Sequence, residues 1–451
     1  MEHKVNYAAE EIEQMLSAKR YRELKSIFSS MEPADIALVF EDVPREQLPL
    51  LYRILPKDMA AEVFVEMDGD EQEFLISAFS DRELKEVLDE MYLDDAVDII
   101  EEMPASVVKR ILIQADPETR RQINEILKYP DDSAGSIMTI EYVSLKADMT
   151  VNDAFTRIRR TGEDKETIYT CYVTDKDRHL IGVVSVRTLL LAEPDDLIGN
   201  IMEKNVTYVT TLEDKEQVAR QFDKYDYLAL PVVDQEKRLV GIVTIDDAMD
   251  VMQEENTEDI EMMAAITPTD KPYMKTGVFE TWKKRIPWLL LLMISATFTG
   301  AIITHYEEAL GAYVVLTAFI PMLMDTGGNA GGQSSVSIIR GMALGEIEYS
   351  DTPKIVLKEV LVALACGITL AVANFIKMMV IDRISPIIAL VVCSTLIVSV
   401  LAAKVIGCTL PILAKRIGFD PAVMASPFIT TIVDAISLMV YFQIATAVLH
   451  I

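Results

Sequence analysis

Apolar residues recur every three to four positions in residues 1–130, a spacing that is typical of amphipathic helices. Three segments, PADIALVFEDVP, PKDMAAEVFVEMD and LDDAVDIIEEMP, share an early aspartate, an apolar stripe and a proline or aspartate at the end. Helical units that repeat in this way stack on their neighbours and bury a common core. The pattern therefore predicts an all-α superhelical domain over residues 1–130.

A different pattern follows and occurs twice. The segments YVTDKDRHLIGVVSVRTLL and VVDQEKRLVGIVTIDDAM align, so that Gly182 and Gly241 occupy matching positions. Each copy reads as helix, strand, polar turn, strand and helix. The nearly continuous apolar strand LVGIVTI indicates burial on both faces. We predict two similar α/β domains, residues 131–200 and 201–256.

Long apolar runs occupy the rest of the chain. Residues 257–281 read as a connector with helical character and a break at Pro268. Beyond it, five stretches approach or exceed the length of about 20 residues that a bilayer-spanning helix needs; they are 286–303, 311–339, 355–380, 385–412 and 423–449. We predict a multidomain membrane protein whose residues 282–451 form an all-α domain of five helices in a lipid bilayer.

Charge separates the two parts of the chain. The net charge is −29, but residues from Gly277 onward contain 11 acidic and 11 basic residues, so the acidic excess lies in residues 1–276. Such a surface repels nucleic acid and attracts cations. Basic residues before the first span, after the second and after the fourth predict cytosolic N-terminal domains in the plasma membrane. Five spans then place the C-terminus outside.

Asp434 lies deep in the last apolar stretch, within SPFITTIVDAISLMVYF. A carboxylate at mid-bilayer costs at least about 2.5 kcal/mol and must face water, a partner or an ion. Thr430 and Thr431 add oxygen atoms toward the same face about one turn earlier. The alternative is a protonated Asp434 that packs two helices through a hydrogen bond.

The second apolar stretch contains PMLMDTGGNAGGQSS, which is unusually polar for a spanning helix. Such backbone is tolerated where it lines a water-filled cavity or where helices approach closely. Close packing explains the glycines, but the amides of Asn329 and Gln333 need polar partners. Facing Asp434, they and Gly328 would line a pathway for a hydrated cation. Mg2+ suits such a pathway, because it prefers oxygen ligands and keeps its water.

Together these motifs resemble the MgtE family of magnesium channels. The paired α/β repeat is similar to a tandem pair of CBS modules, and the helical domain, the repeat and the two membrane motifs occur in the family's order. The resemblance implies a homodimer with five spanning helices per chain and a pore carboxylate at Asp434. It also implies cytosolic domains that bind Mg2+ and close the pore through a plug helix, here about residues 257–273.

The resemblance further implies a set of acidic residues that senses Mg2+. The segment TIDDAMDVMQEENTEDIE supplies most of them, and two more lie in LDDAVDI. The expected ligands are Asp94, Asp98, Asp246, Asp247, Asp250, Glu255, Glu258 and Asp259. Asp420, at the cytosolic mouth of the last helix, fits an ion bridge to the plug helix. A solvated surface charge is the alternative for any one of them.

Many CBS pairs bind adenine nucleotides through a threonine and an aspartate that follow the second strand. The second copy offers Thr244 and Asp247, whereas the first copy has Ser185 and Thr188. The resemblance therefore implies ATP as a ligand of the second copy.

Two other functions remain open from the residues. A transporter of Co2+, Mn2+ or Ni2+ would favour histidine, cysteine or methionine ligands, but the chain has four histidines and none lies near Asp434 in sequence. A membrane-anchored nucleotide sensor would not need an intramembrane aspartate. We expect no enzyme, because the sequence contains no nucleophile–base arrangement, Walker-type loop or zinc motif.

Overall fold

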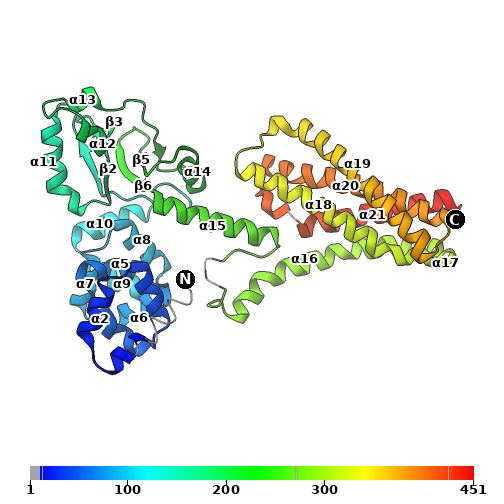
Figure 1. The fold of residues 1–451 in the computed structure, drawn as a ribbon, viewed down its shortest axis with the longest axis horizontal. Coiled ribbons are helices and arrows are strands. Elements are labelled where there is room, and N and C mark those ends of the chain that lie inside the picture. The colour runs from blue at the N-terminus through cyan, green and yellow to red at the C-terminus, as the bar shows by residue number, and fades with distance from the viewer. Residues whose placement is uncertain (1–10, 13, 270, 272, 425, 451) are drawn as a thin grey trace. The chain divides into compact units, whose positions relative to one another are not determined.

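The computed structural model describes residues 11–450 apart from 13, 270, 272 and 425 (Figure 1). The chain divides into two compact units, residues 1–252 and 253–451, and the division falls inside helix α15 (Ile245–Met263). The first unit contains a helical domain and a pair of α/β domains. The second contains the end of α15 and the long apolar helices.

The predicted helical domain is confirmed. Short amphipathic helices follow one another and bury one continuous core that includes Phe28, Phe40 and Phe64. Prolines, Asp68, Ser80 and Asp116 precede or begin many of these helices, as is typical of helix starts. The helices are α2 (Tyr21–Phe28), α3 (Pro33–Glu41), α4 (Leu48–Tyr52), α5 (Lys57–Val65), α6 (Gly69–Ala78), α7 (Asp81–Leu88), α8 (Leu93–Glu102), α9 (Ala105–Gln114) and α10 (Pro117–Ile126).

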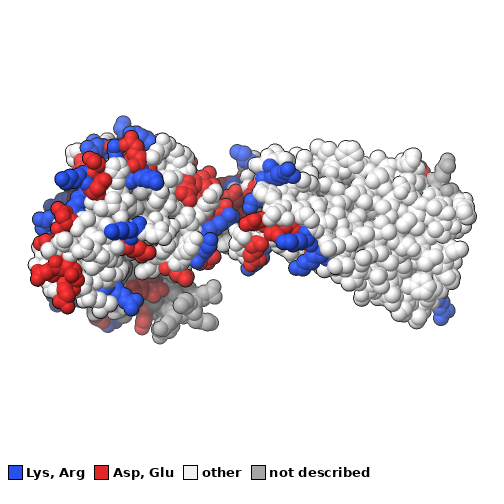
Figure 2. Space-filling view, turned by 90° about the horizontal axis from the view of Figure 1, so that it is seen from above, with Lys and Arg blue, Asp and Glu red and all other residues white. Residues whose placement is uncertain are grey.

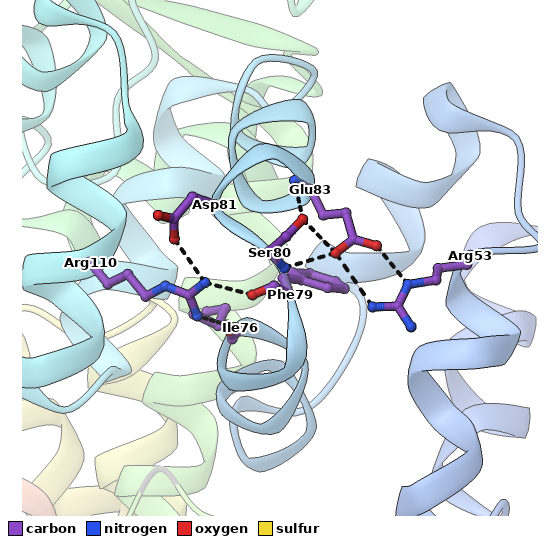
Figure 3. Close-up of polar contacts among 7 residues, drawn as sticks. All are labelled: Arg53, Ile76, Phe79, Ser80, Asp81, Glu83 and Arg110. Carbon is purple, nitrogen blue, oxygen red and sulfur yellow. Dashed lines mark hydrogen bonds and ion pairs between the residues drawn. The ribbon is translucent and has the colours of Figure 1, made fainter.

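Polar side chains hold the ends of these helices together (Figure 3). Ser80 caps α7 in a reciprocal capping box with Glu83. Glu83 also accepts a 2.6 Å hydrogen bond from Nε of Arg53, and this contact lowers the pKa of Glu83 to about 2. Arg110 donates to carbonyl oxygens at the end of α6, including that of Phe79 at 2.6 Å. These carbonyls would otherwise lack partners within the helix.

The predicted pair of α/β domains is also confirmed. Each copy has a three-stranded sheet in which the second strand is antiparallel to the third and parallel to a short first strand. The sequence pattern did not predict these first strands, which are short and have little room for alternation. The strands are β1 (Tyr142–Leu145), β2 (Thr167–Thr174), β3 (Leu180–Ser185), β4 (Val209–Thr210), β5 (Ala229–Val233) and β6 (Leu239–Thr244). The helices are α11 (Val151–Thr161), α12 (Val186–Leu191), α13 (Ile198–Ile201) and α14 (Lys215–Tyr225).

The second unit is a bundle of long helices. They are α16 (Val278–His305), α18 (Ile320–Ala343), α19 (Thr352–Lys377), α20 (Pro386–Arg416) and α21 (Ser426–Leu449), with a short α17 (Glu307–Ala312). Four spans in the described part of the chain are long and apolar enough to cross a bilayer, and they contain α16, α19, α20 and α21. Charged side chains gather at one end of this unit on the face in Figure 2. Helix α18 is long enough but more polar, and it packs against α20 and α21.

The glycine-rich segment lies within the continuous helix α18, inside one of the predicted spanning stretches. Its glycines lie where helices meet. A Cβ atom on Gly328 would lie 2.8 Å from a side-chain carbon of Thr430, and one on Gly331 would lie 2.8 Å from a side-chain carbon of Ile429. Close packing therefore accounts for these glycines.

One correction concerns the connector. The sequence placed a plug helix at about residues 257–273, but α15 ends at Met263. This helix begins at Ile245, directly after β6. It therefore extends from the predicted second α/β domain, which ends at residue 256, into the predicted connector. The helix ends because Ala265 adopts a left-handed conformation, with a φ of 55°, and the backbone nitrogen of Ile266 donates to the carbonyl oxygen of Glu261 across this turn.

The crossing of α18 and α20 gives a testable stability effect. A Cβ atom on Gly407 would overlap the backbone of Gly331, whose carbonyl carbon would lie only 3.0 Å away. We expect Gly407→Ala to destabilise the membrane unit by about 1–3 kcal/mol, the usual effect of overpacking. Gly300→Ala is the matched control, because no atom lies within 4 Å of its added methyl. Thermal unfolding in detergent compares the two, and equal melting temperatures would contradict the packing.

Candidate functional site

Asp434 lies on α21 and is half-buried among the membrane helices. Its Oδ1 atom is buried and has no hydrogen-bond partner among the described residues. Asp325 of α18 interacts with it electrostatically. Two acidic side chains that influence each other in an apolar helical unit create a local negative potential, and a cation relieves their repulsion.

The other residues predicted for the ion pathway divide into two groups. Gly328 and Thr430 contact each other where α18 meets α21, so they contribute to helix packing. Asn329 lies on the exposed face of α18, four residues after Asp325. The hydroxyl of Thr431 donates to the carbonyl oxygen of Pro427 in its own helix at 3.0 Å. Gly328 and Thr430 are thus in contact, whereas Asn329 lies on an exposed polar face of α18.

That polar face continues along α18. Asp325, Asn329 and Gln333 follow at intervals of four residues and are all exposed. Residues at this spacing share one side of a helix. A row of carboxylate and amide groups on a membrane helix is unfavourable against lipid. The face therefore requires water, an ion or another protein surface.

A cluster of acidic side chains lies in the first unit. Carboxylate oxygens of Asp94, Glu141 and Glu166 all lie within 4.8 Å of one another. Asp94 belongs to the first turn of α8 and is only 6% exposed. Glu141 precedes β1 and accepts a hydrogen bond from the backbone nitrogen of Leu93 at 3.2 Å. The cluster therefore joins the helical domain to the first α/β domain.

Burial and mutual repulsion disfavour the charged forms of these acids. Burial, with Asp247 as the next cause, raises the pKa of Asp94 well above its ordinary range and that of Asp95 to about 7. Burial and then Asp246 raise the pKa of Glu166 to about 8. Such a set of oxygens suits a hard divalent cation, which replaces the protons that these acids otherwise hold.

The sequence predicted Asp94 and Asp247 but missed Glu141 and Glu166. Each lies just before a strand, Glu141 as a lone acid and Glu166 shortly after Glu163 and Asp164, and no spacing in the sequence connects either residue to α8. Only the packing of the helical domain on the first α/β domain brings them to Asp94. The linear sequence carries no signal for that contact.

The remaining predicted acids differ in their surroundings. In the first unit, Asp98, Asp246 and Asp250 are exposed. In the second unit, the half-buried residues Glu255, Glu258 and Asp259 lie on the later part of α15. Asp420 is exposed and accepts a 2.7 Å hydrogen bond from the backbone nitrogen of Ala422.

The end of α15 contacts the membrane helices of its own unit. Met262 and Met263 pack against Ile339 of α18 and against Ala422, which lies just before α21. Lys284 of α16 donates to the carbonyl oxygen of Pro268 at 2.5 Å. These contacts place the end of α15 against α18, which carries Asp325, and against the turn that precedes α21, which carries Asp434.

A cavity of about 940 Å³ lies between the two α/β copies. Its lining includes Ser185 and Thr188 of the first copy, together with Tyr169, Arg187 and Tyr227. The predicted nucleotide residues of the second copy lie elsewhere. Thr244 is buried and donates to Oδ2 of Asp247 at 2.6 Å, and Asp247 interacts with the acidic cluster.

The raised pKa values predict a pH-dependent response to Mg2+. Because the folded-state pKa values exceed the ordinary values near 4, the stability from these acids is lost as the pH rises toward 8. We expect the melting temperature of residues 1–252 in the full-length protein to fall from pH 6 to pH 8. Saturating Mg2+ restores it at pH 8 and has little effect at pH 6.

Thermal unfolding with and without Mg2+ checks this expectation. Asp94→Asn with Glu166→Gln should abolish the effect of Mg2+ and reduce the pH dependence, of which Asp95 retains a part. The exposed residue Asp195 provides the matched control, Asp195→Asn. An equal stabilisation by Mg2+ at both pH values would contradict a proton-competing site.

Family models match most of the chain. Residues 320–444 match the divalent cation transporter family MgtE, and residues 31–132 match the MgtE intracellular N domain. Residues 134–195 and 198–254 each match the CBS domain. The helical domain, the repeat and the membrane helices therefore all correspond to known units, in the order that the sequence predicted.

Relatives and solved structures agree with these matches. The magnesium transporter MgtE of Thermus thermophilus is 35% identical, with 95% of this chain and 96% of the relative covered. That of Bacillus subtilis is 31% identical over 97% and 96%. A crystal structure of the cytosolic domain of the Mg2+ channel MgtE in complex with ATP is 37% identical, with a TM-score of 0.51 over 54% of this chain and 99% of the other. This chain belongs to the MgtE family of magnesium transporters.

Proposed function

We propose that this protein forms a channel-like, Mg2+-selective influx pathway in the plasma membrane. This proposal is supported by the buried Oδ1 atom of Asp434, which has no hydrogen-bond partner among the residues that the structure describes and interacts with the acidic residue Asp325. The membrane unit thus offers negative charge and oxygen atoms within apolar helices. Hydrated Mg2+ suits such a site, because its waters donate hydrogen bonds to carboxylate and amide oxygens.

A second copy of the chain completes the pathway in this proposal. The row of Asp325, Asn329 and Gln333 is exposed on α18 and needs a polar surface opposite it. A two-fold homodimer supplies the same row again, because its interface pairs identical surfaces. Two copies of Asp434 would then contribute to one axial passage, and Thr430, Thr431 and Gly328 would line or support it.

Cytosolic Mg2+ closes this pathway in the proposed mechanism. Without the ion, ionised acids around Asp94 repel one another, and unit charges about 4 Å apart cost several kcal/mol near a surface. Mg2+ bound by Asp94, Glu141 and Glu166 stabilises the compact arrangement of the first unit. Asp98, Asp246, Asp247, Asp250, Glu255, Glu258, Asp259 and Asp420 provide further ligands along α15 and at the pore mouth. In this mechanism, the contact of Met262 and Met263 with Ile339 acts as the gate that closes the pathway.

The proposed topology follows from the basic residues that flank the helices. Residues 1–276 lie in the cytosol, α18 is the fifth span, and the C-terminus lies outside. The proposed domain bounds are those that the sequence predicts, namely 1–130, 131–200, 201–256, 257–281 and 282–451. Within the connector, only the last part of α15 serves as the plug helix. Helix α18 tolerates its polar residues because it packs between α20 and α21 and faces the passage.

ATP is the proposed ligand of the cavity between the α/β copies. Arg187 would hold the phosphates, and Tyr169 and Tyr227 would contact the adenine. We expect Arg187→Ala to weaken ATP binding by about tenfold or more, because hydrogen bonds to charged groups contribute about 1.5–3 kcal/mol. Calorimetric titration of the full-length protein measures this. A loss in Thr244→Val with no loss in Arg187→Ala would instead place ATP at the second copy.

Flux through the reconstituted protein tests the proposed function. Full-length protein in liposomes should admit Mg2+ down its gradient faster than protein-free liposomes, and faster than it admits Co2+, Mn2+ or Ni2+. Faster flux of Co2+, Mn2+ or Ni2+ than of Mg2+ would support the alternative function as a transition-metal transporter. No flux of any of these ions would support a membrane-anchored nucleotide sensor and refute the proposal.

A further inference from the structure

Helices α18, α19 and α20 are joined by a buried charged triad. Nζ of Lys404 lies 3.7 Å from Oε2 of Glu359, and the side chains are 6% and 14% exposed. The hydroxyl of Ser334 lies between them: it donates to Oε2 of Glu359 and accepts a 3.3 Å hydrogen bond from Lys404. The three side chains thus form one chain of polar contacts within apolar helices.

This triad is separate from the acids of the proposed pathway. Glu359 and Lys404 neutralise each other, whereas Asp325 and Asp434 are both acidic and form no ion pair within the part of the chain that the structure describes. Ser334 is buried on the packed side of α18, while Gln333, its neighbour in sequence, is exposed with the polar row. A cation that reached Glu359 would meet the positive charge of Lys404. The triad is therefore unsuited to bind a permeating ion.

The position of the triad suggests another role. Lys404 lies next to Ala403, whose carbonyl oxygen would be 3.2 Å from a Cβ on Gly331. Gly331 and Gly407 bring the backbones of α18 and α20 together at this crossing. Glycines have no side chains that could interlock with a neighbouring helix. Packing at this crossing therefore restrains the rotation of α18 about its own axis only weakly. A directional polar contact one turn away restrains that rotation.

We infer that Ser334, Glu359 and Lys404 are positioning residues that fix the rotation of α18 and thereby direct its polar row toward the ion pathway. This inference rests on the proposed function. Rotation of a helix moves every side chain of one face together, so a change at Ser334 also displaces Asn329 and Gln333. Loss of the triad should therefore alter ion selectivity even when the protein remains folded.

Paired substitutions separate positioning from charge and from stability. Glu359→Leu with Lys404→Met removes the polar contact but leaves no unpaired charge, and such apolar replacements are often neutral or stabilising. Glu359→Gln with Lys404→Gln keeps hydrogen-bonding groups without charge. Both variants and the parent are reconstituted at full length, and the ratio of Mg2+ flux to K+ flux is measured together with the melting temperature.

We expect the apolar pair to lower the Mg2+/K+ flux ratio by about tenfold, which corresponds to roughly 1.4 kcal/mol of discrimination. The glutamine pair should keep a ratio close to that of the parent. A parent-like ratio in the apolar pair, or an equal loss in both pairs, would overturn the inference. If the apolar pair does not fold, Ser334→Ala decides: a lowered ratio supports the inference and an unchanged ratio refutes it.

Measurements on the parent protein separate a failure of the proposed function from a failure of this inference. A parent that carries no Mg2+ would refute the proposed function. A parent that carries Mg2+ with selectivity that is independent of the triad would refute this inference alone.

Discussion

Replacing Asp94 with asparagine and Glu166 with glutamine is expected to leave the proposed pathway open at Mg2+ concentrations that, in our proposal, close it in the parent. These residues provide two of three carboxylates whose oxygens lie within 4.8 Å of one another. Without them the ion loses most of its ligands, and only an ion that binds the compact state more tightly can stabilise that state. The midpoint for closure should rise by about tenfold or more, since each 1.4 kcal/mol of lost binding is tenfold.

Flux into liposomes, with Mg2+ varied on the cytosolic side, measures this midpoint. Asp195→Asn is the matched control, because Asp195 is exposed and distant in sequence from the cluster. The variant with Asp250→Ala and Asp259→Ala tests the remaining ligands along α15 in the same assay. Closure of the Asp94 and Glu166 variant at the parent's Mg2+ concentration would show that the sensor lies elsewhere.

The repetitive parts of the fold could be predicted well from the sequence. Apolar spacing identified the helical domain, and the aligned glycines Gly182 and Gly241 identified the paired domains, because periodic burial leaves a periodic pattern. The pattern failed where packing decides the conformation. The polarity of Asn329 and its neighbours left a water-lined cavity and close helix packing both open, whereas the structure shows that the glycines beside them pack against α20 and α21 within a regular helix.

The candidate sites were predictable only in part. Asp434 was visible because a lone acid in an apolar run is conspicuous, and Asp94 was visible through the family resemblance. Glu141 and Glu166 were not, because residues far apart in sequence meet through the docking of separate domains. The contact between Glu359 and Lys404 was not predictable either, because these residues are 45 positions apart and meet only through the packing of α19 against α20.

In the proposed passage, Asp434 is an ionised ligand for a divalent ion. Asparagine at this position keeps the size of the side chain but removes its charge. A carboxylate about 4 Å from a divalent ion contributes several kcal/mol, so its loss should slow Mg2+ flux by about a hundredfold or more. Glutamate should retain part of the flux, because it restores the charge with a longer side chain.

Thr369→Val is the control for insertion and assembly. Thr369 is an exposed polar residue of α19, and its hydroxyl donates to the carbonyl oxygen of Ala365 in its own helix. Its replacement should leave both folding and flux unchanged. A loss of flux in Asp434→Asn alone would then report on the passage and not on membrane insertion.

The decisive measurement is the rate of Mg2+ entry into liposomes that contain equal amounts of correctly inserted parent or Asp434→Asn protein, with the cytosolic side free of Mg2+. We expect Mg2+ to enter through the parent protein and almost none to enter through the variant. Equal rates of entry, with equal preference for Mg2+ over K+, would contradict this expectation.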